Sequence, residues 1–194
     1  KKTNLMLSGG VFGNVKINYK LKNLKRITDV YVQPQMSDGG LCLGASVLED
    51  HKNNLRIKPM LNADLGPKPN TTKLNNFKGL KSKIIIKNLE DEISSQLKKS
   101  KVIGIVRGRM EFGPRALCKR SIIYKTSDNT INDWLNKRMS RTEFMPFAPI
   151  VREEIGKKAF LDFSPKDVTL KFMTSTIRCS QEFIKKCPAV CHVD

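Results

Sequence analysis

The segment NLMLSGGVFGNVKIN, residues 4–18, decides the fold class of this chain. Its leucines form a short apolar run that predicts a β-strand, a glycine-rich turn ends the strand, and the pattern over 14–24 predicts a helix. The next segment, DVYVQPQ (29–35), alternates valines with tyrosine and glutamine, so it predicts a second strand that a proline terminates. SDGGLCLGASVLEDH (37–51) predicts a loop leading into a second helix. Strand–helix–strand–helix in this order indicates a layered α/β fold.

Residues 53–80 break this pattern and predict a linker. Prolines, glycines and asparagines are frequent there, and no hydrophobic periodicity is visible. A second unit follows, in which Asn88 is expected to cap a helix with acidic residues in its first turn and lysines in its last. The expected strands are 83–87, 102–111, 120–125 and 170–177, and the expected helices are 88–101, 126–139 and 153–161.

The formal net charge of +18 first suggests a polyanion as partner. Its distribution argues against nucleic acid, because residues 1–100 carry net +10 and residues 101–194 net +8, without a basic tail. Aromatic residues make up only 7% of the chain, so few side chains could stack on single-stranded bases. A polyanion-binding basic module remains an alternative to an enzyme.

No apolar run is long enough to cross a membrane, and no signal peptide is visible at the start. The five cysteines are odd in number and contain no CxxC pair, which favours reduced thiols in a cytoplasmic protein. Cys187 and Cys191 lie four residues apart beside His192, a spacing that leaves metal ligation as an alternative.

Two glycine-rich turns are candidate ligand sites. Gly9 and Gly10 lie between a strand and the helix at Asn14, where backbone N–H groups can approach an anion. Alternatively, the glycines could be there only because the turn requires backbone angles that glycine adopts most easily, without any ligand. In SDGG (37–40), Asp38 could hold a metal or polarise a phosphate oxygen, or the Ser-Asp pair could simply cap the next helix.

The segment GRMEFGPRALCKRS (108–121) is the strongest candidate for chemistry. It places four cations around one acid, Glu111, and a rigid Gly-Pro turn. Arginine suits bidentate recognition of phosphate or carboxylate, and the turn would hold the flanking side chains in place. Lys137 and Arg141 could add to the same anion pocket. A solvated basic face would explain the lysines but not the rigid turn.

These segments in this order resemble the NodU-type carbamoyltransferase family, which includes antibiotic O-carbamoyltransferases. LSGGVFGNVKIN and VYVQPQMSDGGLCLGA look like the end of that family's N-terminal ASKHA-like domain. GRMEFGPRALCKRSI, NDWLNKRMSRTEFMPFAPIV and CPAVCHVD look like its C-terminal YrdC-like domain. The resemblance implies an α/β protein with the end of an ASKHA-like domain at 1–52, a linker at 53–80, and a truncated YrdC-like domain with a mixed twisted sheet at 81–194.

In that family, ATP and carbamoyl phosphate give carbamoyl adenylate, and the carbamoyl group passes to an acceptor, often a hydroxyl, beside a divalent metal such as Fe or Mg. The matching motifs imply three sets of site residues. The implied catalytic residues are Arg109, Glu111 and Arg115, and the implied metal ligand is Asp38. The residues implied to bind carbamoyl phosphate and the nucleotide are Gly9, Gly10, Asn14, Arg120, Ser121, Lys137 and Arg141. The implied partners are therefore ATP, carbamoyl phosphate and a small hydroxyl-bearing acceptor.

The sequence departs from the family pattern in three places. Cys118-Lys119 stand where Gly-Asn is expected, and Met145 stands where an arginine is expected before PFAP. The metal-binding histidines of the family lie upstream of Asp38, in sequence that this chain does not contain. These departures leave an inactive remnant as a further alternative, one that binds ATP or carbamoyl phosphate but does not complete transfer.

Overall fold

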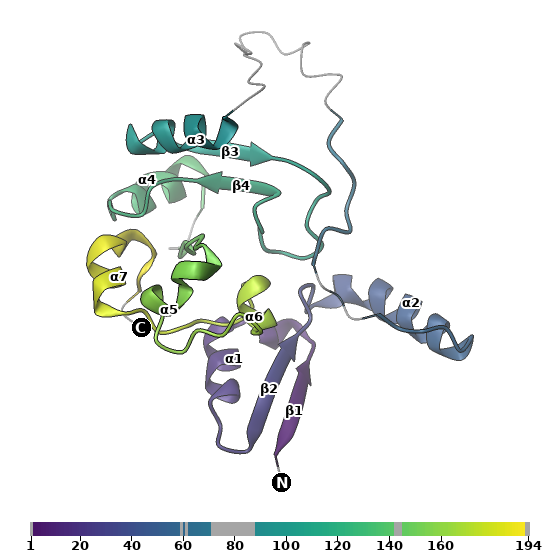
Figure 1. Cartoon of the computed structure of the whole chain (residues 1–194). Coiled ribbons are helices and arrows are strands. Elements are labelled where there is room, and N and C mark those ends of the chain that lie inside the picture. Colours follow the sequence, from purple (N-terminus) through teal and green to yellow (C-terminus); the bar gives the residue numbers. More distant parts are fainter. Residues whose placement is uncertain (1, 59, 61, 71–87, 142–144, 193–194) are drawn as a thin grey trace. The chain divides into compact units, whose positions relative to one another are not determined.

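A computed structural model describes residues 2–58, 60, 62–70, 88–141 and 145–192 (Figure 1). The chain divides into two compact units. The first unit contains Lys1–Ala63, Gly113–Arg115 and Thr126–Asp194, and the second contains Asp64–Phe112 and Ala116–Lys125. The strand expected at 83–87 lies outside the described residues.

The first unit begins with a β–α–β arrangement, as its sequence predicts. Strand β1 (Thr3–Leu7) pairs in parallel with β2 (Ile27–Val32), and helix α1 (Val15–Lys22) connects them (Figure 1). A short 3-10 helix, η1 (Gly10–Gly13), lies between β1 and α1. The carboxyl ends of both strands therefore lie at the same edge of the sheet, the edge at which open α/β sheets bind ligands.

One face of this small sheet forms the core of the first unit. Val30 and Val32 are fully or almost fully buried, and they pack with Met36 beyond the end of β2. Val30 and Val32 lie on the same face of β2 with the half-buried Tyr31 between them, as the two-residue period of a strand requires. The half-buried side chains around them are Leu5, Leu7, Phe12 and Ile27.

The helix expected at 14–24 is confirmed as α1, and its start has a clear cause. The Oδ1 atom of Asn14 accepts hydrogen bonds from the backbone N–H groups of Lys16 (3.0 Å) and Ile17 (3.1 Å). These bonds satisfy two of the backbone donors that the first turn of a helix leaves without a partner. Asn14 is therefore the N-cap of α1, and lysines occupy its last turn.

The helix expected after SDGG is also present. Helix α2 (Leu41–Lys52) follows a 3-10 turn, η2 (Asp38–Gly40). Ser37 stands at the N-cap position of η2 but makes no side-chain capping bond. The remaining helices of the first unit are α4 (Ile131–Arg138), α5 (Gly156–Ala159), α6 (Val168–Lys171) and α7 (Gln181–Lys186), with 3-10 turns η4 (Glu153–Ile155) and η5 (Pro188–Val190).

The strand expected at 170–177 is wrong. Residues Val168–Lys171 form helix α6, because Oδ1 of Asp167 accepts from the backbone N–H (3.0 Å) and the hydroxyl (2.6 Å) of Thr169. The following chain turns rather than extends, since Met173 has a φ of 52° and the N–H of Thr174 returns to the Thr169 carbonyl at 2.8 Å. A capped turn therefore replaces the strand.

Segments far apart in sequence meet on α1. Asn18 is fully buried, and its Nδ2 donates to the carbonyls of Phe12 (2.8 Å) and Thr174 (2.7 Å). One turn later, Lys22 forms an ion pair with Asp167, whose side chain is only 4% exposed. These polar contacts hold the α6 region against the β–α–β arrangement.

The second unit consists of one helix and a two-stranded sheet. Helix α3 (Leu89–Lys98) lies beside β3 (Ile103–Val106), which pairs antiparallel with β4 (Arg120–Ile123) (Figure 1). The predicted acidic first turn is present, but Asn88 has a left-handed backbone (φ 58°) and makes no side-chain capping bond. The acidic residues, rather than a cap, therefore complement the positive end of α3.

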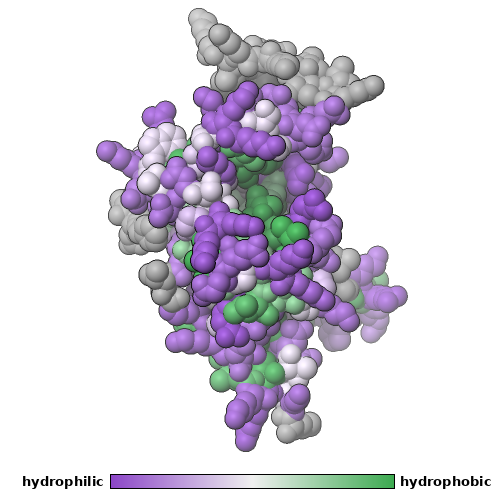
Figure 2. Space-filling model, turned by 60° about the vertical axis from the view of Figure 1, so that its left-hand side comes forward, coloured by the Kyte–Doolittle hydropathy of each residue, from purple (hydrophilic) through white to green (hydrophobic). Residues whose placement is uncertain are grey.

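The predicted mixed α/β class is thus confirmed. None of the helices in the described part of the chain has the length and hydrophobicity required to cross a bilayer. Figure 2 shows hydrophilic residues over most of the visible surface, with hydrophobic residues between them. Some large apolar side chains are strongly exposed, including Met6 (82%) and Leu41 (73%).

Candidate functional site

The predicted site residues are divided between the two units. The second unit holds Arg109, Glu111, Arg120 and Ser121, and the first holds Gly9, Gly10, Asn14, Asp38, Arg115, Lys137 and Arg141. Each group is described within its own unit.

In the second unit, Glu111 organises the backbone of its own motif. One carboxylate oxygen, Oε1, accepts from the backbone N–H groups of Leu117 (2.7 Å), Lys119 (2.6 Å) and Arg120 (3.1 Å). The residue is only 7% exposed. Burial raises the pKa of Glu111, but these backbone hydrogen bonds outweigh burial and leave the pKa below its ordinary value. Glu111 is therefore ionised at neutral pH.

The two arginines of this unit that the motif singles out bind backbone carbonyls. Arg120 donates through Nη1 to the carbonyls of Arg107 and Lys119, both at 2.9 Å. Arg109 donates to the carbonyls of Asp64 (3.2 Å) and Leu65 (2.7 Å). A guanidinium has five N–H donors, and these contacts fix its position. Nη2 of Arg120 also approaches the carbonyls of Pro67 (3.5 Å) and Gly108 (3.4 Å), so Arg109, bound through Nε and Nη2 alone, keeps more donors for an anionic ligand.

The hydroxyl of Ser121 also takes part in the turn. Its Oγ accepts from the backbone N–H of Cys118 at 2.9 Å, just before β4 begins. Nearby, Nζ of Lys119 forms an ion pair with Asp64 at 2.9 Å, and both side chains are about one quarter exposed. The lysine that replaces the expected asparagine is therefore tied to the segment that Arg109 also holds.

In the first unit, Arg115 is held at the carboxyl edge of the sheet. Its Nη2 donates to the Gly13 carbonyl at 2.8 Å, and burial lowers the pKa of its guanidinium. Arginine nevertheless stays charged at neutral pH. The rigid Gly-Pro turn explains the placement: Gly113 has a φ of 124°, and a Cβ on it would lie 2.7 Å from the Pro34 carbonyl oxygen. Only glycine fits this approach.

The glycine turn after β1 lies at the same edge. The N–H of Gly9 donates to the Met36 carbonyl, which ties the turn after β1 to the turn after β2. Gly9 and Gly10 are exposed, and a Cβ on either would meet nothing within 4 Å. Space is therefore available above this backbone for a ligand.

Asn14 and Asp38 have simpler local surroundings. Oδ1 of Asn14 is occupied by the two bonds that cap α1, so the cap alone accounts for an asparagine there. Asp38 is exposed at the start of η2. Its carboxylate could supply one metal ligand, but the described residues contain no group of three His, Cys, Asp or Glu side chains that could hold a metal ion.

Around α4, the motif segments identified in the sequence contact one another. Arg141 lies 5.4 Å from the ring centroid of Phe147, and Nε2 of His192 lies 3.3 Å from the Phe147 carbonyl. Asn132, within α4, donates to the Ala189 carbonyl at 2.8 Å. The NDWLNKR, PFAP and CPAVCH segments therefore form one local cluster. Lys137 is exposed in the last turn of α4.

The five cysteines are free thiols. Burial, followed by the nearby thiols of Cys179 and Cys187, raises the pKa of Cys191 to about 12. A thiol with such a pKa stays protonated at neutral pH and is a poor nucleophile. The described residues contain no group of three or more His, Cys, Asp or Glu side chains that could hold a metal ion. The structure therefore gives no support to metal binding by the Cys187–Cys191 pair.

Sequence reasoning missed two buried polar groups. Among the described residues, the buried oxygens without a hydrogen-bond partner are Oδ1 of Asn18 and Oε1 of Gln35. The side chain of Gln35 lies against Gly39, in the loop that contains Asp38. The sequence offered a single indication that Gln35 is buried, namely its position between Pro34 and SDGG. A glutamine at that position is equally typical of an exposed loop.

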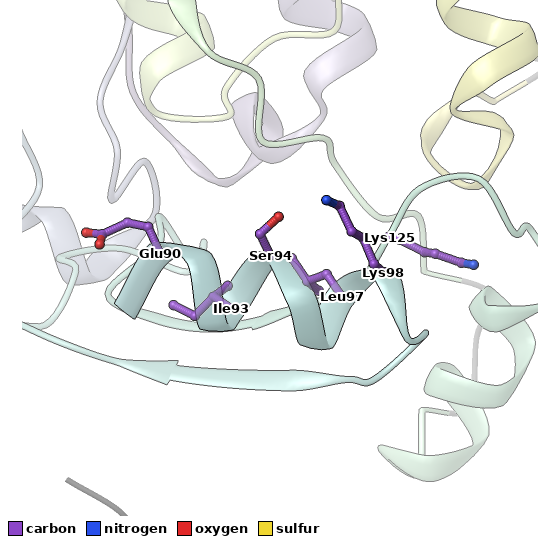
Figure 3. A pocket seen from close by; sticks show the side chains of 6 residues that line it. All are labelled: Glu90, Ile93, Ser94, Leu97, Lys98 and Lys125. Carbon is purple, nitrogen blue, oxygen red and sulfur yellow. The ribbon is translucent and has the colours of Figure 1, made fainter. Parts of the chain in front are cut away.

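A shallow groove of about 390 Å³ lies on α3, and none of the predicted site residues lines it (Figure 3). Its apolar floor is made by Ile93 and Leu97 of α3. The other lining residues are Glu90, Ser94, Lys98 and Lys125. Its only ionisable lining groups are the carboxylate of Glu90 and the ammonium groups of the two lysines.

Cys118 occupies a backbone position that favours glycine. Its φ of 67° lies in the left-handed region, which costs a residue with a Cβ about 1–2 kcal/mol. Cys118→Gly is therefore expected to raise the free energy of unfolding by about 0.5–1 kcal/mol, after the greater backbone entropy of unfolded glycine is subtracted. Urea denaturation measures the change. Cys118→Ala, which keeps a Cβ and removes the thiol, should give no such gain, and an equal gain would contradict this explanation.

Two families of known proteins match this chain. Residues 94–194 match the carbamoyltransferase C-terminus family, and residues 1–47 match the carbamoyltransferase N-terminus family. The chain is 32% identical to nodulation protein NolO of Bradyrhizobium diazoefficiens, across 99% of this chain and 36% of that protein. It is also 32% identical to an uncharacterized protein of Methanocaldococcus jannaschii, across 98% of this chain and 37% of that protein.

A third relative is the 3'-hydroxymethylcephem-O-carbamoyltransferase of Amycolatopsis lactamdurans, which is 30% identical across 82% of this chain and 30% of that protein. The chain spans about a third of the length of the curated relatives it matches. The C-terminal match alone covers more than half of the chain and includes every motif from GRMEFGPRALCKRS to CPAVCHVD. The chain therefore belongs to the carbamoyltransferase family, NodU type.

Proposed function

We propose that the protein to which this sequence belongs transfers a carbamoyl group from carbamoyl phosphate to a hydroxyl-bearing small molecule, with ATP as co-substrate. In balance, carbamoyl phosphate, ATP and water give carbamoyl adenylate, pyrophosphate and inorganic phosphate. The acceptor oxygen then bonds to the carbamoyl carbon, and AMP leaves. The name of the Amycolatopsis relative describes O-carbamoylation, which supports an oxygen acceptor here.

The observation that carries this proposal is the fixed set of guanidiniums in the GRMEFGPRALCKRS motif. Arg109 and Arg120 in the second unit, and Arg115 in the first, are each anchored by at least one backbone carbonyl. Charges that are already positioned stabilise a phosphoryl transition state without reorganisation at the moment of reaction. Chemistry that relies on positioned charges needs no protein nucleophile, which is consistent with the reaction proposed.

The fold assignments within the family are part of the same proposal. The β–α–β arrangement with glycine turns at its carboxyl edge supports an ASKHA-like segment at the start of the chain. The helix and antiparallel strands of the second unit support a YrdC-like segment. The domain boundaries at 53 and 81 remain a prediction.

A divalent metal, Fe or Mg, is proposed for the whole protein and would act as a Lewis acid at the transfer step. The described residues of this chain do not form a complete site for it, since Asp38 offers a single carboxylate. No step of the mechanism is therefore assigned to the metal through residues of this chain.

ATP–pyrophosphate exchange that depends on carbamoyl phosphate tests the proposed function. Arg115→Ala is expected to reduce this exchange by about a hundredfold, the usual effect of removing one preorganised charge donor. The matched control is Arg152→Ala, since Arg152 is exposed and pairs only with its neighbour Glu154 among the contacts described. Equal exchange in the two variants would contradict the role of Arg115. No exchange in the wild-type protein would contradict the activity and favour the inactive remnant.

A further inference from the structure

The environment of Glu111 differs from that of a catalytic acid or base. Three backbone N–H groups converge on its Oε1, from residues six, eight and nine positions further along the chain. Successive N–H groups that point at one anion form a nest, the arrangement with which protein loops bind phosphate and carboxylate. In this structure, the anion in the nest is the chain's own carboxylate.

The protonation state of this carboxylate fits such a role. Burial raises the pKa of Glu111, but the backbone hydrogen bonds hold it below the ordinary value, so the group is not a proton donor at neutral pH. An effective general base needs a pKa close to the working pH and a lone pair free to accept a proton. The pKa of Glu111 is shifted in the wrong direction, and Oε1 is already occupied.

The nest also fixes the cations of the motif. The Arg120 backbone N–H binds Glu111, while its guanidinium binds the carbonyls of Arg107 and Lys119. The Lys119 backbone N–H binds the same carboxylate, while its ammonium binds Asp64. Without the carboxylate, the backbone N–H groups of Lys119 and Arg120 would lose their shared acceptor. The backbone at both residues would then be free to move, and their cationic side chains would move with it.

We propose that Glu111 is a positioning residue: its carboxylate fills a backbone anion nest formed by Leu117, Lys119 and Arg120 and thereby holds the cations of the motif in place. A corollary follows for a protein that lacks this carboxylate. The vacant nest is then a binding site for a small oxyanion of the carboxylate class, such as formate. The structural part of this inference is independent of the proposed function, and only its effect on catalysis rests on carbamoyl transfer.

Chemical rescue tests the nest directly. In Glu111→Ala, amide hydrogen exchange at Leu117, Lys119 and Arg120 is expected to rise about tenfold or more, because three charge-assisted bonds are lost. Sodium formate should restore protection at these three amides, whereas sodium chloride at equal ionic strength should not. Glu111→Gln, which keeps an acceptor oxygen without the charge, should lie between the wild type and Glu111→Ala. The control is Glu154→Ala, since Glu154 is exposed and pairs with Arg152.

Two outcomes would overturn the proposal: unchanged exchange at the three amides in Glu111→Ala, or no difference between formate and chloride. Kinetics then separate positioning from catalysis. A positioning role predicts a lower kcat/KM, partial rescue by Gln and an unchanged pH profile, whereas a general base predicts no rescue by Gln and loss of a limb of the pH profile. If the wild-type protein shows no pyrophosphate exchange, the proposed function fails, while the amide measurements still decide the role of Glu111.

Discussion

Replacement of Asp167 by alanine is expected to lower the free energy of unfolding by about 4 kcal/mol. Asp167 is almost fully buried and makes three contacts at once: an ion pair with Lys22 and hydrogen bonds from the backbone and hydroxyl of Thr169. Removing the carboxylate leaves a half-buried ammonium without its partner and removes the cap of α6. Urea denaturation of the purified protein measures the loss.

A matched control is available in the same unit. Asp162 forms a two-pronged ion pair with Arg178, but their side chains are 41% and 62% exposed. Solvent screens such pairs, so Asp162→Ala should cost less than about 1 kcal/mol. Asp167→Asn should fall between the two, because its amide oxygen can still cap α6. Similar losses in Asp167→Ala and Asp162→Ala would contradict the importance of burial.

Gly113→Ala is expected to cost about 3 kcal/mol, the second largest effect. The added Cβ would lie 2.7 Å from the oxygen and 3.1 Å from the carbon of the Pro34 carbonyl, and the φ of 124° is itself unfavourable for alanine. Both close atoms belong to the backbone, so no side-chain rotation relieves the contact. The turn must therefore shift, and Arg115, two residues later, would lose its bond to Gly13.

Measurement of both stability and pyrophosphate exchange tests this prediction. Exchange should fall in Gly113→Ala at temperatures where the protein is still folded, because Arg115 is displaced. Gly44→Ala is the control, since Gly44 lies within α2, has nothing within 4 Å of an added Cβ, and should gain up to about 1 kcal/mol. A Gly113→Ala protein with wild-type stability would show that the turn adapts without strain.

The sequence by itself determined the local structure near the start of the chain and in α3. The alternation along β2, the helix at 14–24 and the charge order along α3 act within a few residues, so they could be predicted without tertiary structure. The cap predicted at Asn88 is wrong, whereas the cap at Asn14 is seen only in the structure. The family motifs were equally local, and the matches over 1–47 and 94–194 confirm them. The positive φ of Cys118 also agrees with the glycine that the motif leads one to expect there.

The strand predicted at 170–177 shows where local pattern misleads. Phe172 and Thr174 are buried, while Lys171 is exposed, an alternation that resembles a strand. The left-handed backbone of Met173 and the bond from Thr174 back to Thr169 close a turn instead. Burial of alternate residues is common to both structures, so the period alone could not distinguish them.

Only the tertiary structure decided the roles of the charged and polar side chains. Asn18 binds a carbonyl 156 residues away, Lys22 pairs with an aspartate 145 residues away, and Arg115 binds a carbonyl 102 residues away. Even Glu111, whose type and position the motif specifies, contacts backbone N–H groups that no side-chain pattern records. The sequence thus determined which residues carry charge and where the backbone must turn. The fold determined which partner each charge meets, because these partners are brought together by chain topology rather than by spacing along the sequence.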